Sequence, residues 1–200
     1  MSSIKEIIIV GTGGHAVSCL EAVDSGDEFR VAGFISDQQQ DEFMGYPILG
    51  TDSDLPELVK NYKNACIGVG QIGSADSRVY VYKMLRMLGF DLPAVISSSA
   101  HVSKLAQIGE GSIIMHGAVV NALAKIGENS IINSMALIEH GSQIGRDCHV
   151  STGVLINGDC VIGDRSFIGS GAVLKHGSIL PSESFVKMGE IIGRSGANYG

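Results

Sequence analysis

The chain has 200 residues, of which 44% are hydrophobic, and its formal net charge at pH 7 is −7. This negative charge argues against nucleic acid and against an anionic membrane as partners. No apolar run approaches the roughly 20 residues that cross a bilayer, and residues 1–6 lack the basic start and long apolar stretch of a secretory signal. The expected location is therefore the cytoplasm.

Residues 1–93 alternate between short apolar runs and amphipathic segments, which is typical of a small α/β unit. Strands are expected at 7–10, 30–35 and 66–69, and helices at 16–23 and from residue 76 or 77 onward. The second helix has an apolar face that includes Val81, Leu85 and Leu88. About 93 residues supply only half of a doubly wound sheet, so we predict a Rossmann-like half domain suited to a single nucleotide.

A glycine-rich loop joins the first predicted strand to the first predicted helix. Gly11, Gly13 and Ala16 satisfy the pattern GxGxxA in the context where backbone N–H groups and a helix N-terminus hold phosphate. Taken alone this match is weak, because a tight strand-to-helix turn needs similar residues without any ligand. Both interpretations stay open at this point.

From residue 94 onward the sequence has a period of six. Every sixth residue from Ile96 to Ile192 is aliphatic, and the pair Ile-Gly recurs every 18 residues, at 108, 126, 144 and 162. Neither an α-helix nor a single strand has this period, whereas a chain that turns after each short strand does, with three corners closing one triangular coil. We therefore predict an all-β parallel coil over residues 94–200, in which residues 18 apart are lateral neighbours.

Six histidines are present, and most are expected to be solvated turn residues. His140 lies two positions after the aliphatic Ile138, which places it at a corner of the coil with its side chain outward. A zinc site needs several imidazoles that converge on one ion. His140 and His176 share a column two coils apart, but the pair of histidines five residues apart that a gamma-carbonic-anhydrase coil would use is absent. We therefore expect no metal.

Two acidic residues are candidate charge partners of His140. Glu139 precedes it, and Asp159 follows Gly141 by 18 residues and so lies one coil above that glycine. A carboxylate near an imidazole raises its basicity and fixes its tautomer, as general-base catalysis requires. Either acid can equally be a solvated turn charge.

Four features together resemble a known family. They are the stretch Ile7 to His15 (IIIVGTGGH), the strand end Ser36-Asp37, the turn sequence Gly45 to Gly50 (GYPILG) and a six-residue repeat that carries Ile138-Glu139-His140. In this order they are similar to the sugar-nucleotide acyltransferases of the bacillosamine, perosamine and sialic-acid pathways, over nearly the whole chain. The resemblance implies that residues 1–93 hold a UDP- or GDP-linked sugar. It also implies that residues 94–200 form a left-handed parallel β-helix, which trimerises and binds acetyl-CoA between subunits.

The resemblance implies roles for individual residues. His140 matches the general base that takes a proton from the sugar amine as its nitrogen attacks the thioester. The residues implied to face the sugar nucleotide are Gly13, Gly14, His15 and Asp37, with Gly70 and Arg78 as further candidates. The residues implied to line the acetyl-CoA groove are His149, Ser170 and Met188. The spacing of Ser170 and Met188 independently places both in one column with Thr152.

The chain departs from the family pattern in two places. The family has Asp or Glu directly after the catalytic histidine, where this chain has Gly141, so we expect Asp159 to supply the charge from the next coil. The stretch from Gly189 to Gly200 lacks the Gly-x-Pro-Ala-Lys ending that is common in such enzymes, and no contacts are carried over to it.

The sequence favours a cytoplasmic, homotrimeric N-acetyltransferase that acts on a nucleotide-linked amino sugar in glycan or surface polysaccharide synthesis. O-acetylation of a sialic-acid-like sugar needs similar base chemistry, and nothing in the sequence separates the two reactions. Two alternatives belong to other classes of protein. They are a non-catalytic β-helix scaffold and a metal-dependent protein of the gamma-carbonic-anhydrase type.

Overall fold

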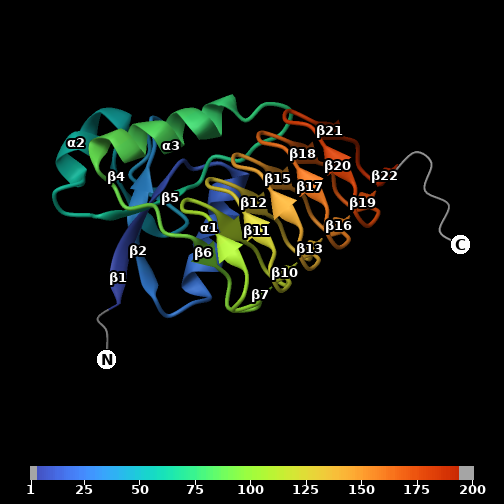
Figure 1. The fold of residues 1–200 in the computed structure, drawn as a ribbon. Helices are drawn as coiled ribbons and strands as arrows, with labels where there is room; N and C mark the ends of the chain where they lie inside the picture. Colours follow the sequence, from blue (N-terminus) through green and yellow to red (C-terminus); the bar gives the residue numbers. More distant parts are fainter. Residues whose placement is uncertain (1–3, 194–200) are drawn as a thin grey trace, which may run out of the picture.

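The computed structural model describes residues 4–193, and its amino-terminal part is a mainly parallel sheet flanked by helices (Figure 1). The elements are β1 (Lys5–Val10), α1 (Gly14–Asp24), β2 (Phe29–Ile35), β3 (Glu42–Phe43), β4 (Tyr46–Gly50), the 3-10 turn η1 (Asp52–Asp54), α2 (Leu55–Leu58), β5 (Asn64–Ile67) and α3 (Asp76–Leu88). The strand order is β3-β4-β2-β1-β5, with β3 and β4 antiparallel. Alternate residues of β1 face opposite layers. Ile7 and Ile9 pack with α1, whereas Ile8 and Val10 pack with α2 and α3.

The strands and helices predicted for this unit are present with small shifts. β5 ends at Ile67, two residues earlier than predicted, and the chain leaves the sheet at Gly68. A Cβ at Gly68 would lie 2.8 Å from the Cβ of Ala16, so only glycine lets α1 pack this closely. The short elements β3, β4 and α2 have no clear helix or strand pattern in the sequence. The position of β4, for example, depends on its pairing with β2.

Residues 95–192 form three stacks of two-residue parallel strands. The first face holds β6 (Val95–Ile96), β9 (Ile113–Ile114), β12 (Ile131–Ile132), β15 (His149–Val150), β18 (Phe167–Ile168) and β21 (Phe185–Val186). The second face holds β7 (His101–Val102), β10 (Val119–Val120), β13 (Leu137–Ile138), β16 (Leu155–Ile156), β19 (Val173–Leu174) and β22 (Ile191–Ile192). The third face holds β8 (Gln107–Ile108), β11 (Lys125–Ile126), β14 (Gln143–Ile144), β17 (Val161–Ile162) and β20 (Ile179–Leu180).

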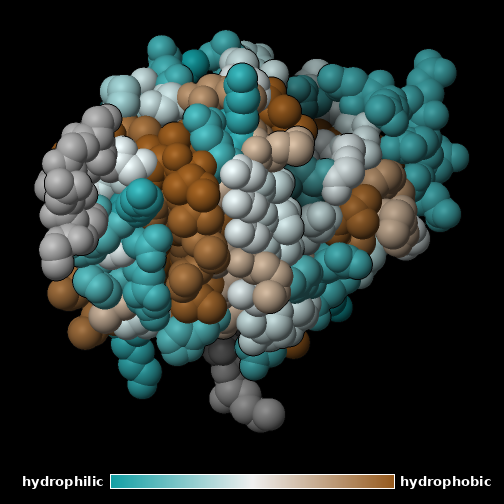
Figure 2. Space-filling view, turned by 90° about the vertical axis from the view of Figure 1, so that its right-hand side faces the viewer, coloured by the Kyte–Doolittle hydropathy of each residue, from teal (hydrophilic) through white to brown (hydrophobic). Residues whose placement is uncertain are grey.

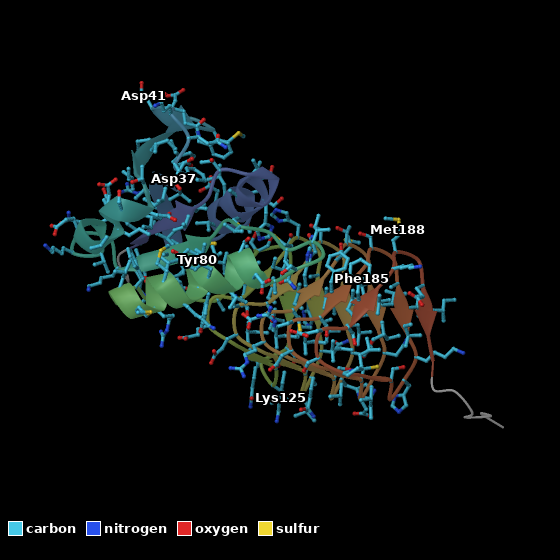
Figure 3. All side chains as sticks on the ribbon, turned by 90° about the horizontal axis from the view of Figure 1, so that it is seen from above. Asp37, Asp41, Tyr80, Lys125, Phe185 and Met188 are labelled. Carbon is cyan, nitrogen blue, oxygen red and sulfur yellow. The ribbon has the colours of Figure 1, made fainter. Side chains whose placement is uncertain are left out.

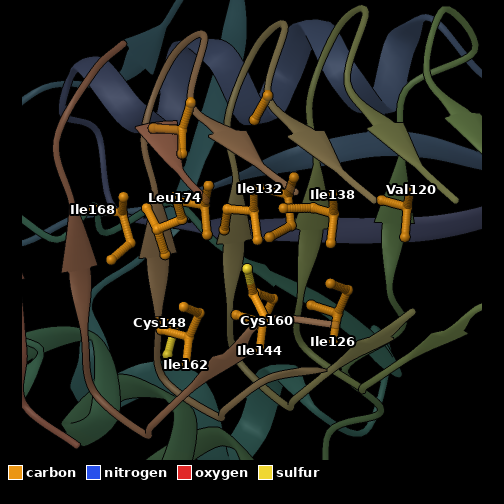
Figure 4. Packing of buried hydrophobic residues seen from close by; sticks show 14 of the residues in the cluster. Val120, Ile126, Ile132, Ile138, Ile144, Cys148, Cys160, Ile162, Ile168 and Leu174 are labelled. Atoms are coloured by element: carbon orange, nitrogen blue, oxygen red, sulfur yellow. The ribbon is translucent and has the colours of Figure 1, made fainter. Parts of the chain in front are cut away.

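Each strand of the coil pairs with the strand 18 residues away, as Leu137 does with Leu155. The predicted triangular coil is therefore confirmed, and it is a left-handed parallel β-helix. The second residue of each strand points into the coil, where aliphatic side chains from the three faces meet (Figure 4). Ile138 and Val150 are fully buried there.

From Gly111 to Gly189, one position in every corner adopts the left-handed backbone region. Gly141 has φ 69°, and Asp159, at the same position one coil later, has φ 55°. Glycine reaches this region without strain, and aspartate is among the few other residues that visit it routinely. The glycine at position 141 therefore fits this corner without backbone strain.

The amino-terminal unit packs on the first face of the coil. Side chains of α1 and β1 share one buried cluster with Ile113 and Ile131 of that face. Arg78 of α3 is 1% exposed and joins the two parts through polar contacts. Its guanidinium donates four hydrogen bonds of 2.9 to 3.1 Å, to the carbonyl oxygens of Ile67, Val69, Gly111 and Asn129.

We expect Arg78→Met to lower the free energy of unfolding by about 3 kcal/mol or more, because the buried carbonyl groups lose their donors. Urea denaturation measures this change. Arg86→Met is the matched control, since the guanidinium of Arg86 pairs with Glu110 at the surface, at 3.0 Å. Its expected cost is below about 1 kcal/mol. An equal loss of unfolding free energy in the two variants would contradict the proposal that Arg78 holds the amino-terminal unit and the coil together.

α3 ends at Leu88 and β6 begins at Val95, so the change of structure falls within residues 89–94. The division into separate domains, 1–93 and 94–200, stays a prediction. None of the helices among residues 4–193 has the length and apolar character that a membrane span needs. Residues 194–200, at the altered carboxyl end, lie outside the described residues.

Candidate active site

A cavity of about 760 Å³ opens at the carboxyl ends of β1, β2 and β5. Its walls include the three loops that follow these strands, which are residues 11–15, 36–38 and 68–72. Ligands of open parallel sheets bind at this edge. Five of the residues predicted to face a sugar nucleotide line the cavity, namely Gly13, Gly14, His15, Asp37 and Gly70.

Arg78, the sixth residue predicted to face the nucleotide, is absent from the cavity wall. Four of its five N–H groups bind backbone carbonyls, as described above. The structure therefore corrects the expectation for Arg78. Its guanidinium is buried between the amino-terminal unit and the coil, where it holds the two together.

The amino end of α1 faces the cavity without a side-chain cap. Gly13 is the N-cap residue and makes no side-chain hydrogen bond. The ideal Cβ positions at Gly13 and Gly14 meet no other atom within 4 Å, so the space in front of this turn is open. Uncapped N–H groups and the helix dipole favour an anion, and a nucleotide diphosphate fits this end of the cavity.

His15 is a neutral imidazole in the cavity wall. Burial, together with the nearby Arg78 and His149, lowers its pKa to about 3. Its Nε2 is buried and has no hydrogen-bond partner among the described residues. Gly70 leaves room for the ring, because a Cβ at that position would lie 3.2 Å from the Cβ of His15. His15 therefore contributes an uncharged ring to the cavity wall.

His15 should make the stability of the fold depend on pH. Its folded pKa of about 3 lies below the ordinary 6.5, so folding favours the neutral form. The resulting stabilisation is fully present above pH 6.5 and is lost as the pH falls toward 3. We expect His15→Asn to flatten the plot of unfolding free energy against pH between about pH 4 and 7. The exposed His101 offers a control, and a His15→Asn plot with the wild-type slope would oppose this prediction.

Two carboxyl groups, those of Asp37 and Asp52, line the same cavity. Burial, and secondly the charge of Asp37, raise the pKa of Asp52. Carboxylates at this edge of the sheet accept hydrogen bonds from sugar hydroxyls or from base N–H groups. The family resemblance indicates Asp37, which directly follows the predicted strand 30–35, whereas Asp52 lies in η1 and no motif points to it.

His149 lies on the first face of the coil, next to the cavity, and is 7% exposed. Its Nδ1 is 2.6 Å from the carbonyl oxygen of Gln71, and its Nε2 is 3.2 Å from Nδ2 of Asn133. A carbonyl oxygen can only accept, so Nδ1–H donates to Gln71 and Nε2 accepts from Asn133. Burial lowers the pKa of His149, which favours this neutral form. Both ring nitrogens are therefore engaged within the chain.

A column of exposed residues runs along the corner between the first and second faces. The amide of Gly171 donates to the carbonyl of Thr152, and that of Gly189 donates to Ser170, each at 2.9 Å. The predicted alignment of Thr152, Ser170 and Met188 is thus confirmed. At three glycines of this corner an ideal Cβ meets nothing within 4 Å, namely Gly153, Gly171 and Gly189. We call this corner the open strip. Figure 3 shows Met188 on the same side of the molecule as Asp37 of the cavity, with Lys125 on the opposite side.

His140 lies exposed at the corner between the second and third faces, as predicted. Oε2 of Glu139 accepts a hydrogen bond of 3.2 Å from the backbone N–H of His140. The carboxylate of Asp159 occupies the space that a Cβ at Gly141 would need. No residue of this corner lines the cavity, and the amino-terminal unit covers the first face. Within one chain, His140 and the cavity therefore lie on different sides of the coil.

No group of three His, Cys, Asp or Glu side chains suited to a metal ion occurs in the part of the chain that the structure describes. His140 and His176 do lie near each other, with ring centroids 6.4 Å apart. His15 and His149 also lie near each other, where Nδ1 of His149 binds the carbonyl oxygen of Gln71 beside the cavity.

The fold and the site define a transferase built on hexapeptide repeats. The model of the PglD N-terminal domain matches residues 6–85, and the model of the bacterial transferase hexapeptide (six repeats) matches residues 123–158 and 141–176. No curated protein matches the chain.

Similar solved structures cover almost the whole chain. The acetyltransferase domain of PglB from Neisseria gonorrhoeae has 30% identity and a TM-score of 0.83, over 94% of this chain and 91% of that one. A mutant of perosamine N-acetyltransferase from Caulobacter crescentus, in complex with CoA and GDP-perosamine, has 29% identity and a TM-score of 0.88, over 95% of this chain and 89% of that one. This chain therefore belongs to the family of hexapeptide-repeat acetyltransferases that carry a PglD N-terminal domain.

Proposed function

We propose that this protein transfers an acetyl group from acetyl-CoA to the amine of a nucleotide-linked amino sugar, for glycan or surface polysaccharide synthesis. The observation that carries the proposal is the cavity at the carboxyl ends of β1, β2 and β5, with an uncapped helix end and the neutral His15 in its wall. The similar Caulobacter enzyme was crystallised with CoA and GDP-perosamine, and the PglB domain with acetyl coenzyme A. Both complexes support the proposal.

The cavity is the proposed seat of the sugar nucleotide. The first N–H groups of α1, at Gly14 and His15, would bind the diphosphate, because this helix end has no side-chain cap. Asp37 would accept hydrogen bonds from the base, and Gly70 would leave room for the His15 ring. The sugar then extends from the diphosphate toward the mouth of the cavity.

We propose that acetyl-CoA binds along the open strip. The extended pantetheine arm could follow a path along its three glycines, where no side chain projects from the coil. Ser170 and Met188 would border this path, and the exposed thioether of Met188 offers an apolar contact. His149 would lie between the open strip and the cavity, since it contacts Gln71 of the cavity wall.

His140 is the proposed general base. It would take a proton from the sugar amine as the nitrogen attacks the acetyl carbonyl carbon. The C–N bond forms, the C–S bond breaks, and CoA leaves as a thiol with the proton that His140 took from the amine. Backbone N–H groups can stabilise the negative charge on the carbonyl oxygen during this step. Transfer is direct, without a covalent enzyme intermediate.

A second copy of the chain is needed to bring His140 to the cavity, so we propose a homotrimer with sites between subunits. The outward residues of five strands of the second face are apolar, namely Val119, Leu137, Leu155, Val173 and Ile191. Leu155 is 41% and Ile191 is 67% exposed. The side of the molecule that carries the last coils shows a band of apolar residues (Figure 2). This stripe borders the corner of His140, where packing of a neighbour would complete the site.

Incubation with acetyl-CoA and a panel of sugars tests the proposal. GDP- and UDP-linked 4-amino sugars and sialic acids are supplied one at a time, and free thiol is measured together with the mass of the product. Thiol release with an amino sugar and a mass gain of one acetyl group are expected. A product acetylated on a sialic-acid hydroxyl would favour O-acetylation instead. No thiol release with any sugar would oppose the proposal and favour a scaffold.

A further inference from the structure

His140 is not directly followed by an acid, and the carboxylate beside Gly141 comes from the coil above. Gly141 takes the left-handed corner position, and the carboxylate of Asp159 fills the space beside it. The amide of Asp159 also donates a hydrogen bond of 3.0 Å to the carbonyl of His140, so the two corners are tied together. The preceding acid, Glu139, is engaged with the backbone N–H of His140.

A second imidazole faces His140 across a gap. His176 lies two coils above, where regular stacking would separate the backbones by about 10 Å. The ring centroids are nevertheless only 6.4 Å apart, because the intervening residue of the column is Gly158. An ideal Cβ at Gly158 would lie 2.8 Å from Nε2 of His140 and 3.2 Å from Nδ1 of His176. Ring nitrogens of both histidines thus border one gap, which glycine keeps open.

Asp159 lies near Nε2 of His176, on the side of that ring away from the gap. Its Oδ2 lies 3.7 Å from Nε2 of His176. A carboxylate there favours the tautomer with the proton on Nε2, and Nδ1 then presents a lone pair to the gap. Two further charges stand near this corner. Lys175 lies beside Gly193 in the next coil, and by the 18-residue spacing Lys104 lies two coils below His140.

We propose that His176, oriented by Asp159, is a positioning residue for His140 and together with Asp159 replaces the acid that is absent at Gly141. When His140 accepts the amine proton, the resulting imidazolium faces the Nδ1 lone pair of His176, and the charge of Asp159 stabilises the arrangement from behind. This inference rests on the proposed function of His140 as a general base. It assigns to one column, His140, Gly158 and His176, the task of setting the basicity of the site.

An NMR titration of the His140 ring tests this inference without any substrate. Wild type is compared with His176→Phe, which keeps a ring but lacks the acceptor, and with Asp159→Asn. Each change should lower the titration midpoint of the His140 Cε1–H signal, because the ring loses a neighbour that stabilises its charged form. His176→Asn should restore part of the wild-type midpoint, since its side-chain oxygen can stand near the position of Nδ1. All replaced residues are exposed, and circular dichroism checks the fold.

The double variant adds a second criterion. If both residues act through one path, His176→Phe with Asp159→Asn moves the midpoint no further than either single change. His101→Phe, on the second face, is the control and should leave the midpoint unchanged. An unchanged or raised midpoint in His176→Phe would overturn the proposal. If the midpoint decreases only in Asp159→Asn, Asp159 acts on His140 without His176, which also overturns the role of His176.

Kinetics then separate this inference from the proposed function. If the wild type transfers acetyl groups, the acidic limb of the pH profile of kcat/KM should move in the variants, in the same direction along the pH axis as the NMR midpoints. The KM for acetyl-CoA should stay unchanged. Gly158→Ala should lower kcat by about 10-fold or more, because its methyl group displaces both rings from the gap. If no sugar is acetylated but the midpoints still shift, the proposed function fails and the link between the two histidines stands.

Discussion

Replacing His140 by asparagine should lower kcat for acetyl transfer by about 10²- to 10⁴-fold. Asparagine keeps a polar side chain of similar reach but cannot take up the amine proton. The residue is exposed at a corner, so the fold should be unaffected. Thiol release under saturating concentrations of both substrates measures kcat, and initial rates at low concentrations measure kcat/KM. Equal losses in both quantities would indicate that His140 acts in the transition state.

His101→Asn is the control for this prediction, because His101 is also exposed on the coil but lies in β7, two coils below the strand β13 that precedes His140. Its kcat should stay within about twofold of wild type. A His140→Asn variant with wild-type kcat would show that another group accepts the proton. It would also remove the reason to place the chemistry at the corner between the second and third faces.

Trimers assembled from two inactive variants should have about one quarter of the wild-type activity. One variant is His140→Asn, and the other is Gly14→Asp, which places a negative charge where the diphosphate would bind. The ideal Cβ of Gly14 meets nothing within 4 Å, so this aspartate fits without disturbing the fold. In randomly mixed trimers, about one interface in four combines an intact cavity with an intact His140 from the neighbour.

The mixed trimers can be made by co-expression with two different tags, and native mass spectrometry verifies their composition. Each variant alone should be inactive, and mixing the two proteins without subunit exchange should restore nothing. If verified mixed trimers remain inactive, the cavity and His140 do not combine across a subunit interface. That result would require a different route from the cavity to the base, because the two lie on different sides of one coil.

Much of the candidate site follows from the sequence because the coil is regular. With a period of six and a coil of 18 residues, position alone places His140 outward at a corner and Asp159 above Gly141. It also places Ser170 below Met188, and the structure has each of these arrangements. Their proposed roles stay predictions. The cavity residues after β1 and β2 could also be predicted, because the glycine loop and the strand end that carry them are local motifs in the sequence.

The remaining features depend on contacts between distant residues. The sequence suggests Arg78 as a ligand of the nucleotide, but only the packed structure shows its guanidinium bound to the carbonyls of Gly111 and Asn129. Asp52 reaches the cavity because η1 packs beside it, which no local pattern reveals. His149 is far from Gln71 in sequence, yet their hydrogen bond joins the coil to the cavity.

The sequence by itself determined the coil, its register and the order of residues along each corner, because these follow from a short-range repeat that every coil imposes on the next. Only the tertiary structure decided the state of the histidines. His15 is neutral because it is buried beside Arg78, and both nitrogens of His149 are engaged by Gln71 and Asn133. His140 meets His176 because Gly158 leaves a gap between them. Burial and side-chain direction depend on what packs around a residue, and that information is spread over the whole chain.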